Sequence, residues 1–202
     1  MKFFEKWPHD RLGDICHKIG SGSTPRGGEN VYRTEGPAII RSQNVYNGIF
    51  NADGLARLSE DHAEQLEGVM VEAGDVLLNI TGDSVARCCQ APEWVIPARV
   101  NQHVAIIRPT AGFNARFLET CLLFPSMKKR LLRIAGAGAT REAITKPAIE
   151  QLEVIQPPRA DQDFFAEIMR EREALERQQQ LASSQLDALF ASLQHCAFGG
   201  EL

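Results

Sequence analysis

The sequence predicts an α+β domain followed by one long C-terminal helix. Short runs of β-branched and apolar residues alternate with turn signals, which is typical of strands. Segments with helix-capping residues lie between and after these runs. From Asp161 to about His195 there is neither Pro nor Gly, and apolar residues recur in a heptad pattern. We therefore expect a domain over residues 1–158, with a mixed, curled β-sheet and short helices, and a coiled-coil helix over residues 159–202.

The predicted strands are short and bounded by turn dipeptides such as Asn47–Gly48, Asp53–Gly54 and Gly82–Asp83. Residues 10–20 are expected to form a short helix or strand that leads into the glycine-rich stretch GSGSTPRGGEN. The strand-like runs that follow are 38–45, 75–81, 84–89, 94–97 and 102–109.

Helices are predicted where a capping residue precedes a helical pattern. Ser59 is the expected N-cap of a helix that ends near Gly68. Asn114 is the expected N-cap of a second helix, which Pro125 interrupts before SMKKRLLRIA continues helically. Thr145 is the expected N-cap of a third, KPAIEQL.

The C-terminal helix carries a heptad seam with 3-4 spacing in which only Arg172 and Gln179 are polar. Polar residues at such positions can fix register and partner number. A lone helix of this kind would expose an apolar stripe, so we expect it either to pair with a second copy or to fold back on its own domain. The predicted dimer-interface residues are Phe165, Ile168, Arg172, Leu175, Gln179, Ala182, Leu186, Leu189 and Leu193.

Charge and composition narrow the function classes. The chain carries 22 Lys+Arg and 26 Asp+Glu; residues 159–202 hold 4 of the former and 8 of the latter, so residues 1–158 are balanced. A balanced domain disfavours a nonspecific polyanion-binding coat but allows a local basic cleft. No apolar run reaches the roughly 20 residues of a membrane helix, the N-terminus has no signal-peptide pattern, and the five cysteines show no CxxC spacing. We expect a cytoplasmic protein without a membrane partner.

Several segments, in order over nearly the whole chain, together resemble the DNA-specificity subunits of type I restriction–modification systems. Each is similar to a signature of that family. They are LGDICHKIGSGSTP, IIRSQNV, GDVLLNITGDSVARC, NQHVAIIRP, GATREAITKPAIEQLEVIQPP and LDALFASLQHCAFGGEL.

The resemblance implies a noncatalytic DNA-recognition role. A typical member has two target-recognition domains, each followed by a long helix; the helices pack antiparallel, and each domain reads one half of a bipartite DNA site. This chain shows one domain and one helix, so it looks like half a specificity subunit, whether a natural half-length form or a fragment. The resemblance implies double-stranded DNA, methylation subunits and restriction subunits as partners, a homodimer through the helix, and S-adenosylmethionine, ATP and Mg on partner subunits only. The alternative is a coiled-coil interaction scaffold, or a truncated fragment without DNA recognition of its own.

Two of the candidate DNA-contact segments come early in the chain. In the glycine-rich loop, glycines allow close approach to a phosphate and Arg26 supplies a cation, although such loops are often merely flexible. The next segment, RSQN, combines an Arg, a Gln and an Asn, the side chains that read base edges, although Asn44 could instead cap a bend. The predicted contacts here are Ser21, Ser23, Thr24, Arg26, Arg41, Ser42, Gln43 and Asn44.

Two further candidate segments follow. Polar residues after the predicted strand 75–81 and before the predicted strand 102–109 could contact DNA, or Asn79 could simply face solvent and His103 could be a packing residue. The GAGATREAITK stretch joins a hydroxyl and cations to the helix capped by Thr145, which suits a phosphate, although it could equally be a capping turn or brace the domain against the long helix. The predicted contacts here are Thr81, Ser84, Arg87, Gln102, His103, Thr140, Arg141 and Lys146.

The motifs of common enzyme classes are missing from the sequence. No GxSxG motif surrounds Ser84, no Walker loop follows the glycine-rich stretch, and no methyltransferase or helicase motif is visible. The His, Cys and carboxylate residues lack metal-ligand spacing. We therefore expect neither catalytic residues nor a metal or cofactor site in this chain.

Overall fold

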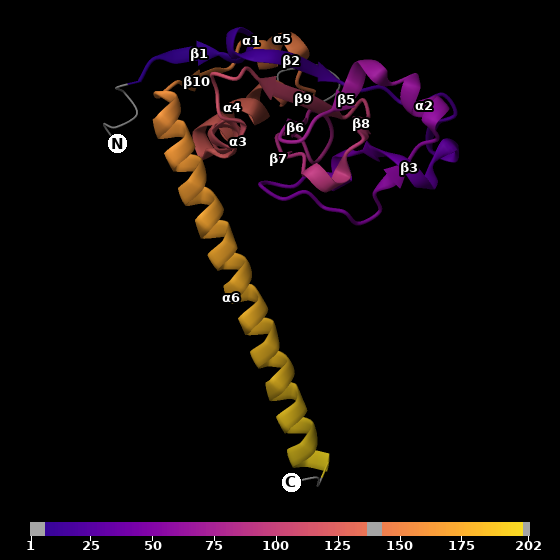
Figure 1. Cartoon of the computed structure of the whole chain (residues 1–202), viewed down its shortest axis with the longest axis vertical. Coiled ribbons are helices and arrows are strands. Elements are labelled where there is room, and N and C mark those ends of the chain that lie inside the picture. Colours follow the sequence, from indigo (N-terminus) through magenta and orange to yellow (C-terminus); the bar gives the residue numbers. More distant parts are fainter. Residues whose placement is uncertain (1–6, 137–142, 200–202) are drawn as a thin grey trace. The chain divides into compact units, whose positions relative to one another are not determined.

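The computed structural model describes residues 7–136 and 143–199, as a globular unit that ends at Gln162 and a helical unit that begins at Asp163 (Figure 1). The helix of the second unit, α6, starts within the first, because it spans Arg159–Gly199. Two four-stranded sheets and a two-stranded sheet form the globular unit. The predicted α+β class with one long C-terminal helix is confirmed.

The first four-stranded sheet is antiparallel throughout and has the order β2-β9-β6-β7. Strand β6 pairs with β9 over its full length, so that Val76 lies opposite Ile107 and Asn79 opposite Val104. The strands are β2 (Cys16–Ser21), β6 (Val76–Asn79), β7 (Cys88–Gln90) and β9 (Val104–Pro109).

The second four-stranded sheet is mixed and has the order β4-β3-β8-β5. Strands β3 and β8 run parallel, with Ala38 opposite Ala98 and Ile40 opposite Val100, whereas the edge strands are antiparallel to them. The strands are β3 (Arg33–Ile40), β4 (Ala56–Arg57), β5 (Met70–Val71) and β8 (Ala98–Val100). The sequence analysis missed β4, β5 and β8, because two- and three-residue strands carry too little alternation to be recognised.

The main hydrophobic core lies between these two sheets. Ile40 and Val100 of the mixed sheet pack with Leu77 and Ile106 of the antiparallel sheet, and all four are fully buried. Successive residues of a strand point to opposite faces, so Ile39 faces a second cluster, with Leu58, Ala63 and Leu66. Helix α2 (Glu60–Glu64) closes that side, and Ser59 caps it by accepting a hydrogen bond from the His62 amide.

Short helices complete the globular unit. Helix α3 (Ala115–Leu123) is capped by Asn114, as predicted, and packs against β7 and β6. Helix α4 (Pro125–Gly136) starts at the proline expected to interrupt the segment. Helix α5 (Lys146–Glu150) is capped by Thr145, as predicted. Helix α1 (Leu12–Ile15) and the sheet formed by β1 (His9–Arg11) and β10 (Glu153–Ile155) join the two ends of the unit.

Two predicted strands are largely turns. Of residues 84–89 only the last two belong to β7, because the Val85 and Arg87 amides close turns onto the Gly82 and Ser84 carbonyls. The segment 94–97 contains no strand: Glu93–Val95 is a single 3₁₀ turn, with the Ile96 amide donating to the Glu93 carbonyl. In both places hydrogen bonds within the segment replace the ladder bonds of a strand.

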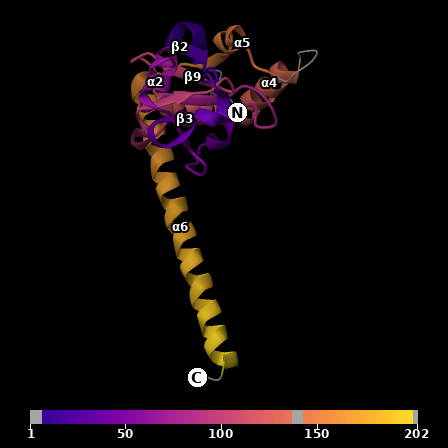
Figure 2. The ribbon, with the colours of Figure 1, turned by 90° about the vertical axis from the view of Figure 1, so that its right-hand side faces the viewer.

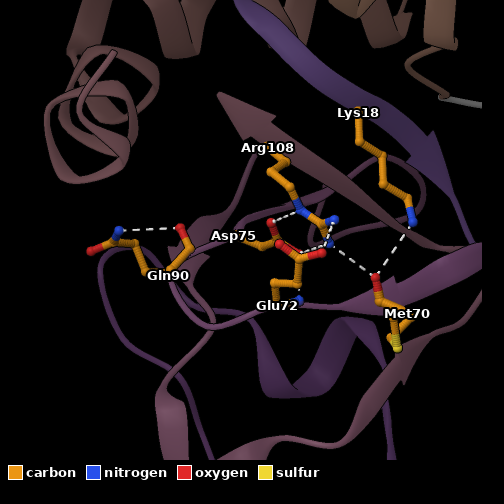
Figure 3. Close-up of polar contacts among 7 residues, drawn as sticks. Lys18, Met70, Glu72, Asp75, Gln90 and Arg108 are labelled. Carbon is orange, nitrogen blue, oxygen red and sulfur yellow. Dashed lines mark hydrogen bonds and ion pairs between the residues drawn. The ribbon is translucent and has the colours of Figure 1, made fainter. Parts of the chain in front are cut away.

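An ion pair between the partly exposed Arg108 and the buried Asp75 joins the central strand β9 to the loop before β6 (Figure 3). Arg108 donates from Nε to Asp75 Oδ1 over 2.7 Å and from Nη2 to Asp75 Oδ2 over 2.8 Å. Arg108 also contacts the Glu72 carboxylate and donates to the Met70 carbonyl, to which Lys18 Nζ donates as well. These bonds raise the pKa of Arg108 above its ordinary value. The pKa of Lys18 is lowered, first by burial and next by the nearby positive charge of Arg108.

In the helical unit the predicted seam is exposed. Leu175, Leu186, Leu189 and Leu193 are each between 52% and 66% exposed. Phe190, next to this seam on the helix surface, is 63% exposed. The helix has 41 residues, which corresponds to about 60 Å at 1.5 Å per residue.

Candidate nucleic-acid interface

The candidate loops converge at one edge of the two packed sheets. Parallel strands end at the same edge, and β3 and β8 run parallel. Strands β2 and β6 share a direction as well, because both are antiparallel to β9. The Asn101 amide donates to the Ile40 carbonyl, and the Gly22 amide donates to the Asn101 carbonyl, so the loops after β2, β3 and β8 touch one another.

A chain of side-chain hydrogen bonds crosses three of these loops. Thr24 Oγ1 donates to Gln102 Oε1 over 2.6 Å, and Gln102 Nε2 lies 2.8 Å from His103 Nε2. His103 Nδ1 lies 2.6 Å from Thr81 Oγ1. With the Gln102 amide nitrogen donating to Nε2, the imidazole donates from Nδ1 to the Thr81 oxygen, which leaves the Thr81 hydroxyl hydrogen free to donate outward. We call these four residues the Thr24–Thr81 chain.

The backbone beneath the Thr24–Thr81 chain is closely packed. A side chain at Gly22 would place its Cβ 1.7 Å from the Val100 carbonyl oxygen, so only glycine fits there. Asn101 is 7% exposed, and its side-chain oxygen accepts a hydrogen bond from the His103 amide. The chain therefore sits on a rigid support although its residues come from loops.

Asn79, at the end of β6, is fully buried, so the solvent-facing alternative for this residue is wrong. Its Nδ2 donates to the Ser42 carbonyl over 2.9 Å and lies 3.1 Å from Ser84 Oγ and 3.3 Å from the Val45 carbonyl. Asn79 thus ties the loop after β3 to the loop after β6. A buried amide must satisfy its donors, and here the donors fix the position of two candidate contact loops.

Within RSQN, Asn44 and Arg41 are bound to the protein itself. Asn44 is fully buried; its oxygen accepts from the Arg41 amide and its Nδ2 donates to the Asn51 carbonyl, which is the bend-capping alternative. Arg41 donates to the Gly54 carbonyl over 2.6 Å, pairs with Glu29, and lies 5.1 Å from the centre of the Tyr32 ring. Of this segment, Gln43 is the residue whose side chain is exposed.

Arg87 is half-buried, and its guanidinium lies 4.9 Å from the centre of the Tyr46 ring. Tyr46 belongs to the turn between Val45 and Phe50, which is closed by the bond from the Tyr46 amide to the Ile49 carbonyl. The turn is anchored to β7 by the bond from the Gly48 amide to the Cys88 carbonyl. Stacking on an aromatic ring leaves the edge of a guanidinium available for hydrogen bonding.

The remaining predicted contacts lie as follows. Ser21, Ser23, Thr24, Arg26 and Gln102 are exposed, and Thr81, Ser84, Ser42 and His103 are half-buried. Lys146 is exposed and lies 3.6 Å from Glu150. Thr140 and Arg141 lie outside the described residues.

The sequence analysis missed the roles of Asn101, Tyr46 and Asp75. The first supports the Thr24–Thr81 chain, the second stacks on Arg87 and the third anchors Arg108. Asn101 carried a weak signal, because it is a polar residue between two apolar runs; nothing in the sequence pairs Asp75 with Arg108.

Within residues 7–136 and 143–199, no group of His, Cys, Asp and Glu is arranged to hold a metal ion. None of the helices described there is apolar and long enough to cross a bilayer.

Comparisons with known proteins identify the fold. No protein-family model and no curated sequence matches the chain. Among solved structures, a chain from a study of complex assembly and conformational transition of the type I restriction–modification system matches with a TM-score of 0.64 and 21% identity, over 97% of this chain and 46% of that one. The chain has the fold of a type I restriction–modification S subunit.

Two further S-subunit structures support this fold assignment. The HsdS subunit from Thermoanaerobacter tengcongensis matches with a TM-score of 0.58 and 19% identity, over 86% of this chain and 40% of that one. The S subunit from M. genitalium matches with a TM-score of 0.58 and 15% identity, over 88% of this chain and 41% of that one. The chain therefore spans less than half the length of each S subunit it matches, with one globular unit and one long helix.

Proposed function

We propose that this chain is a noncatalytic, sequence-specific DNA-binding module of a type I restriction–modification system, and that its globular unit reads one half-site of a bipartite target. The observation that carries the proposal is the S-subunit fold over 97% of the chain. The Thr24–Thr81 chain supports it, because a preorganised set of amide and hydroxyl groups suits hydrogen bonding to base edges and phosphates.

Base reading is assigned to the exposed or outward-facing members of the interface. Gln43 and Gln102 are exposed, and an amide can bind adenine through two hydrogen bonds. The Gln102 amide also bonds to Thr24 and His103, and Gln43 donates weakly to the Gly54 carbonyl, but each amide keeps a second N–H and a second oxygen lone pair for a base. Arg87, held over Tyr46, can present its guanidinium edge to guanine or to a phosphate. Arg41 and Asn44 are assigned to loop support instead, because their polar groups already bind Gly54 and Asn51.

The helix α6 is proposed to pair with α6 of a second copy. Its seam residues Leu186, Leu189 and Leu193 are more than half exposed, and burying them in a coiled coil would remove that apolar surface from water. A symmetric dimer would recognise an inverted repeat. A rod of about 60 Å corresponds to about 18 base pairs at 3.4 Å per step, so the two half-sites are expected to be separated by a gap.

The partners proposed for this dimer are double-stranded DNA, methylation subunits and restriction subunits, in the cytoplasm. S-adenosylmethionine, ATP and Mg would bind to those subunits and not to this chain. The scaffold alternative shares the exposed seam but requires no DNA reading.

Selection from a random-sequence DNA library with the purified full chain tests the proposal. The expected product is a gapped inverted repeat. An ungapped motif would refute the two-copy arrangement, and the absence of any enriched motif would favour the scaffold alternative.

A variant pair tests the assignment of the reading residues. Gln102→Ala should weaken binding to the selected site by roughly tenfold or more, on the scale of a lost base contact. Lys18→Gln, a change in β2 at a residue that binds the Met70 carbonyl, serves as control and should leave the selected motif unchanged. Equal effects of the two substitutions would remove Gln102 from the reading residues.

A further inference from the structure

Helix α4 carries a cationic face to which the comparisons with S-subunit structures assign no role. Its segment PSMKKRLLRIAG contains four basic residues and no acidic one, in a protein of net charge −4. Lys129, Arg130 and Arg133 are all exposed. With Ser126, also exposed, they have the i, i+3, i+4, i+7 spacing that places residues on one side of a helix. We call these four residues the α4 cationic face.

The opposite side of α4 is anchored in the globular unit. Leu131 and Ala135 are buried, at 0% and 1% exposure. Lys128 is half-buried and has the i, i+3, i+7 spacing with Leu131 and Ala135, so it lies on the anchored side and is not counted in the cationic face. Because the apolar side fixes the rotation of the helix, the three cations are held outward on a rigid element and do not hang from a loop.

Among the described residues, no carboxylate pairs with the cations of this face. In the ranges that the structure describes, no ion pair joins Lys129, Arg130 or Arg133 to a carboxylate, whereas Lys146 pairs with Glu150 and Arg116 with Glu119. Like charges three or four residues apart on a helix destabilise it. An arrangement that costs stability and lacks internal counter-charges indicates an anionic partner.

Helix α4 adjoins the candidate interface through its anchored side. The Ala143 amide donates to the Ala135 carbonyl at the end of α4 over 3.3 Å, and Ala143 forms a β-bridge with Thr81. Thr81 is the last member of the Thr24–Thr81 chain. Figure 2 shows α4 at the edge of the globular unit, near α5. The cations therefore lie on the outer side of a helix whose inner side is linked to the proposed base-reading loops.

We propose that the α4 cationic face binds the phosphate backbone of the DNA whose bases the adjoining loops read. This inference rests on the proposed function and adds a site to it: Lys129, Arg130 and Arg133 each contact a phosphate, and the Ser126 hydroxyl lies where it can donate to the same strand. Such contacts fix the register of the protein on the duplex without reading its sequence. They release counterions, so they make binding depend on salt.

The test compares two triple variants in the full chain. Lys129→Gln/Arg130→Gln/Arg133→Gln removes the cationic face. Arg11→Gln/Arg33→Gln/Arg177→Gln removes three other exposed cations and makes the same change in net charge. Binding to the motif selected by the wild-type chain is measured between about 50 and 200 mM salt, the range in which phosphate contacts dominate the change in affinity.

In the α4 variant, the negative slope of the logarithm of the binding constant against the logarithm of salt concentration should become shallower by about 2 to 3, close to 0.9 per lost phosphate contact. The control variant should change it by less than about 1, and both should select the wild-type motif. Circular dichroism confirms that both variants are folded, and charge-conserving Lys129→Arg should retain the wild-type slope.

Two outcomes would overturn the inference while leaving DNA reading intact. One is an α4 variant whose slope equals that of the control. The other is a loss of dimer mass with an unchanged slope, which would assign the face to the acidic C-terminal segment of a second copy. A wild-type chain that selects no motif would instead refute the proposed function itself.

Discussion

Replacing Asp75 by Asn should destabilise the globular unit by about 2–4 kcal/mol. Asp75 is 2% exposed, and its carboxylate accepts two hydrogen bonds from Arg108 and one from the Glu72 amide. The amide of an Asn keeps one oxygen but turns an NH₂ group toward one of these donors. The Arg108 guanidinium then loses its buried counter-charge and keeps the more exposed Glu72 carboxylate.

The magnitude follows from the burial of the two partners. Breaking a buried ion pair by removing one partner costs about 3–5 kcal/mol. The Arg108 side chain is 20% exposed and keeps the Glu72 carboxylate and the Met70 carbonyl, so the expected cost is shifted below that range, to about 2–4 kcal/mol. At about 2–4 °C per kcal/mol for a chain of this size, the midpoint of thermal unfolding should fall by about 5–15 °C.

Urea unfolding at pH 7, followed by circular dichroism, measures the change. Glu72→Gln is the matched control: this carboxylate also contacts Arg108 but is 56% exposed, so its loss should cost about 1 kcal/mol or less. Asp75→Asn combined with Arg108→Met removes both charges and should recover part of the loss. A loss for Asp75→Asn below about 0.5 kcal/mol, the range of an ordinary surface change, would refute this account of the pair.

Three further predictions concern the long helix, a buried carboxyl and the buried thiols. Leu186→Glu should convert the proposed dimer to a monomer, as measured by light scattering. Leu181→Glu, at a residue equally exposed but on the other side of α6, should leave the dimer intact. If both variants remain dimers, the seam is not the dimer interface. Burial raises the pKa of Glu119, an effect that Arg116 partly offsets, so the contribution of Glu119 to stability is full below the ordinary pKa of 4.5 and is lost as the pH rises through the folded pKa. The wild type should therefore gain stability relative to Glu119→Gln as the pH falls toward 4.5. Parallel profiles of stability against pH for the two proteins would contradict this. Burial raises the pKa of Cys88, and it raises that of Cys89 to about 12. Peptide mass spectrometry should therefore find both buried thiols unalkylated by iodoacetamide at pH 8 until urea unfolds the chain. Labelling at equal rates with and without urea would contradict their burial.

Local signals were sufficient where the structure depends on neighbours in sequence. Asn114 and Thr145 were recognised as N-caps because capping joins a side chain to amides two or three residues away. The heptad spacing of Leu186, Leu189 and Leu193 predicted the long helix for the same reason. Segment 94–97 was misassigned, because its apolar and β-branched residues suit a strand while the chain forms a 3₁₀ turn.

In the candidate site, too, local features could be predicted from the sequence and contacts between distant residues could not. Residue types alone singled out Thr24, Thr81, Gln102 and His103, but nothing in the sequence showed that hydrogen bonds link them. In the same way, Arg41 and Asn44 have base-reading chemistry, yet the fold uses that chemistry for Gly54 and Asn51. A side chain's type states which bonds it can form; its neighbours in space decide which it does form.

By itself, then, the sequence determined the α+β class, the caps, the seam and the resemblance to S subunits, because each depends on residue type at short, fixed spacing. Only the tertiary structure decided that the loops after β2, β3, β6 and β8 share one edge, that Asn79 is buried between two of them, and that α4, which carries the cations, is linked to the same edge. These facts follow from strand direction and from contacts between residues far apart in the chain, such as Asn79 with Ser42, which residue spacing cannot specify.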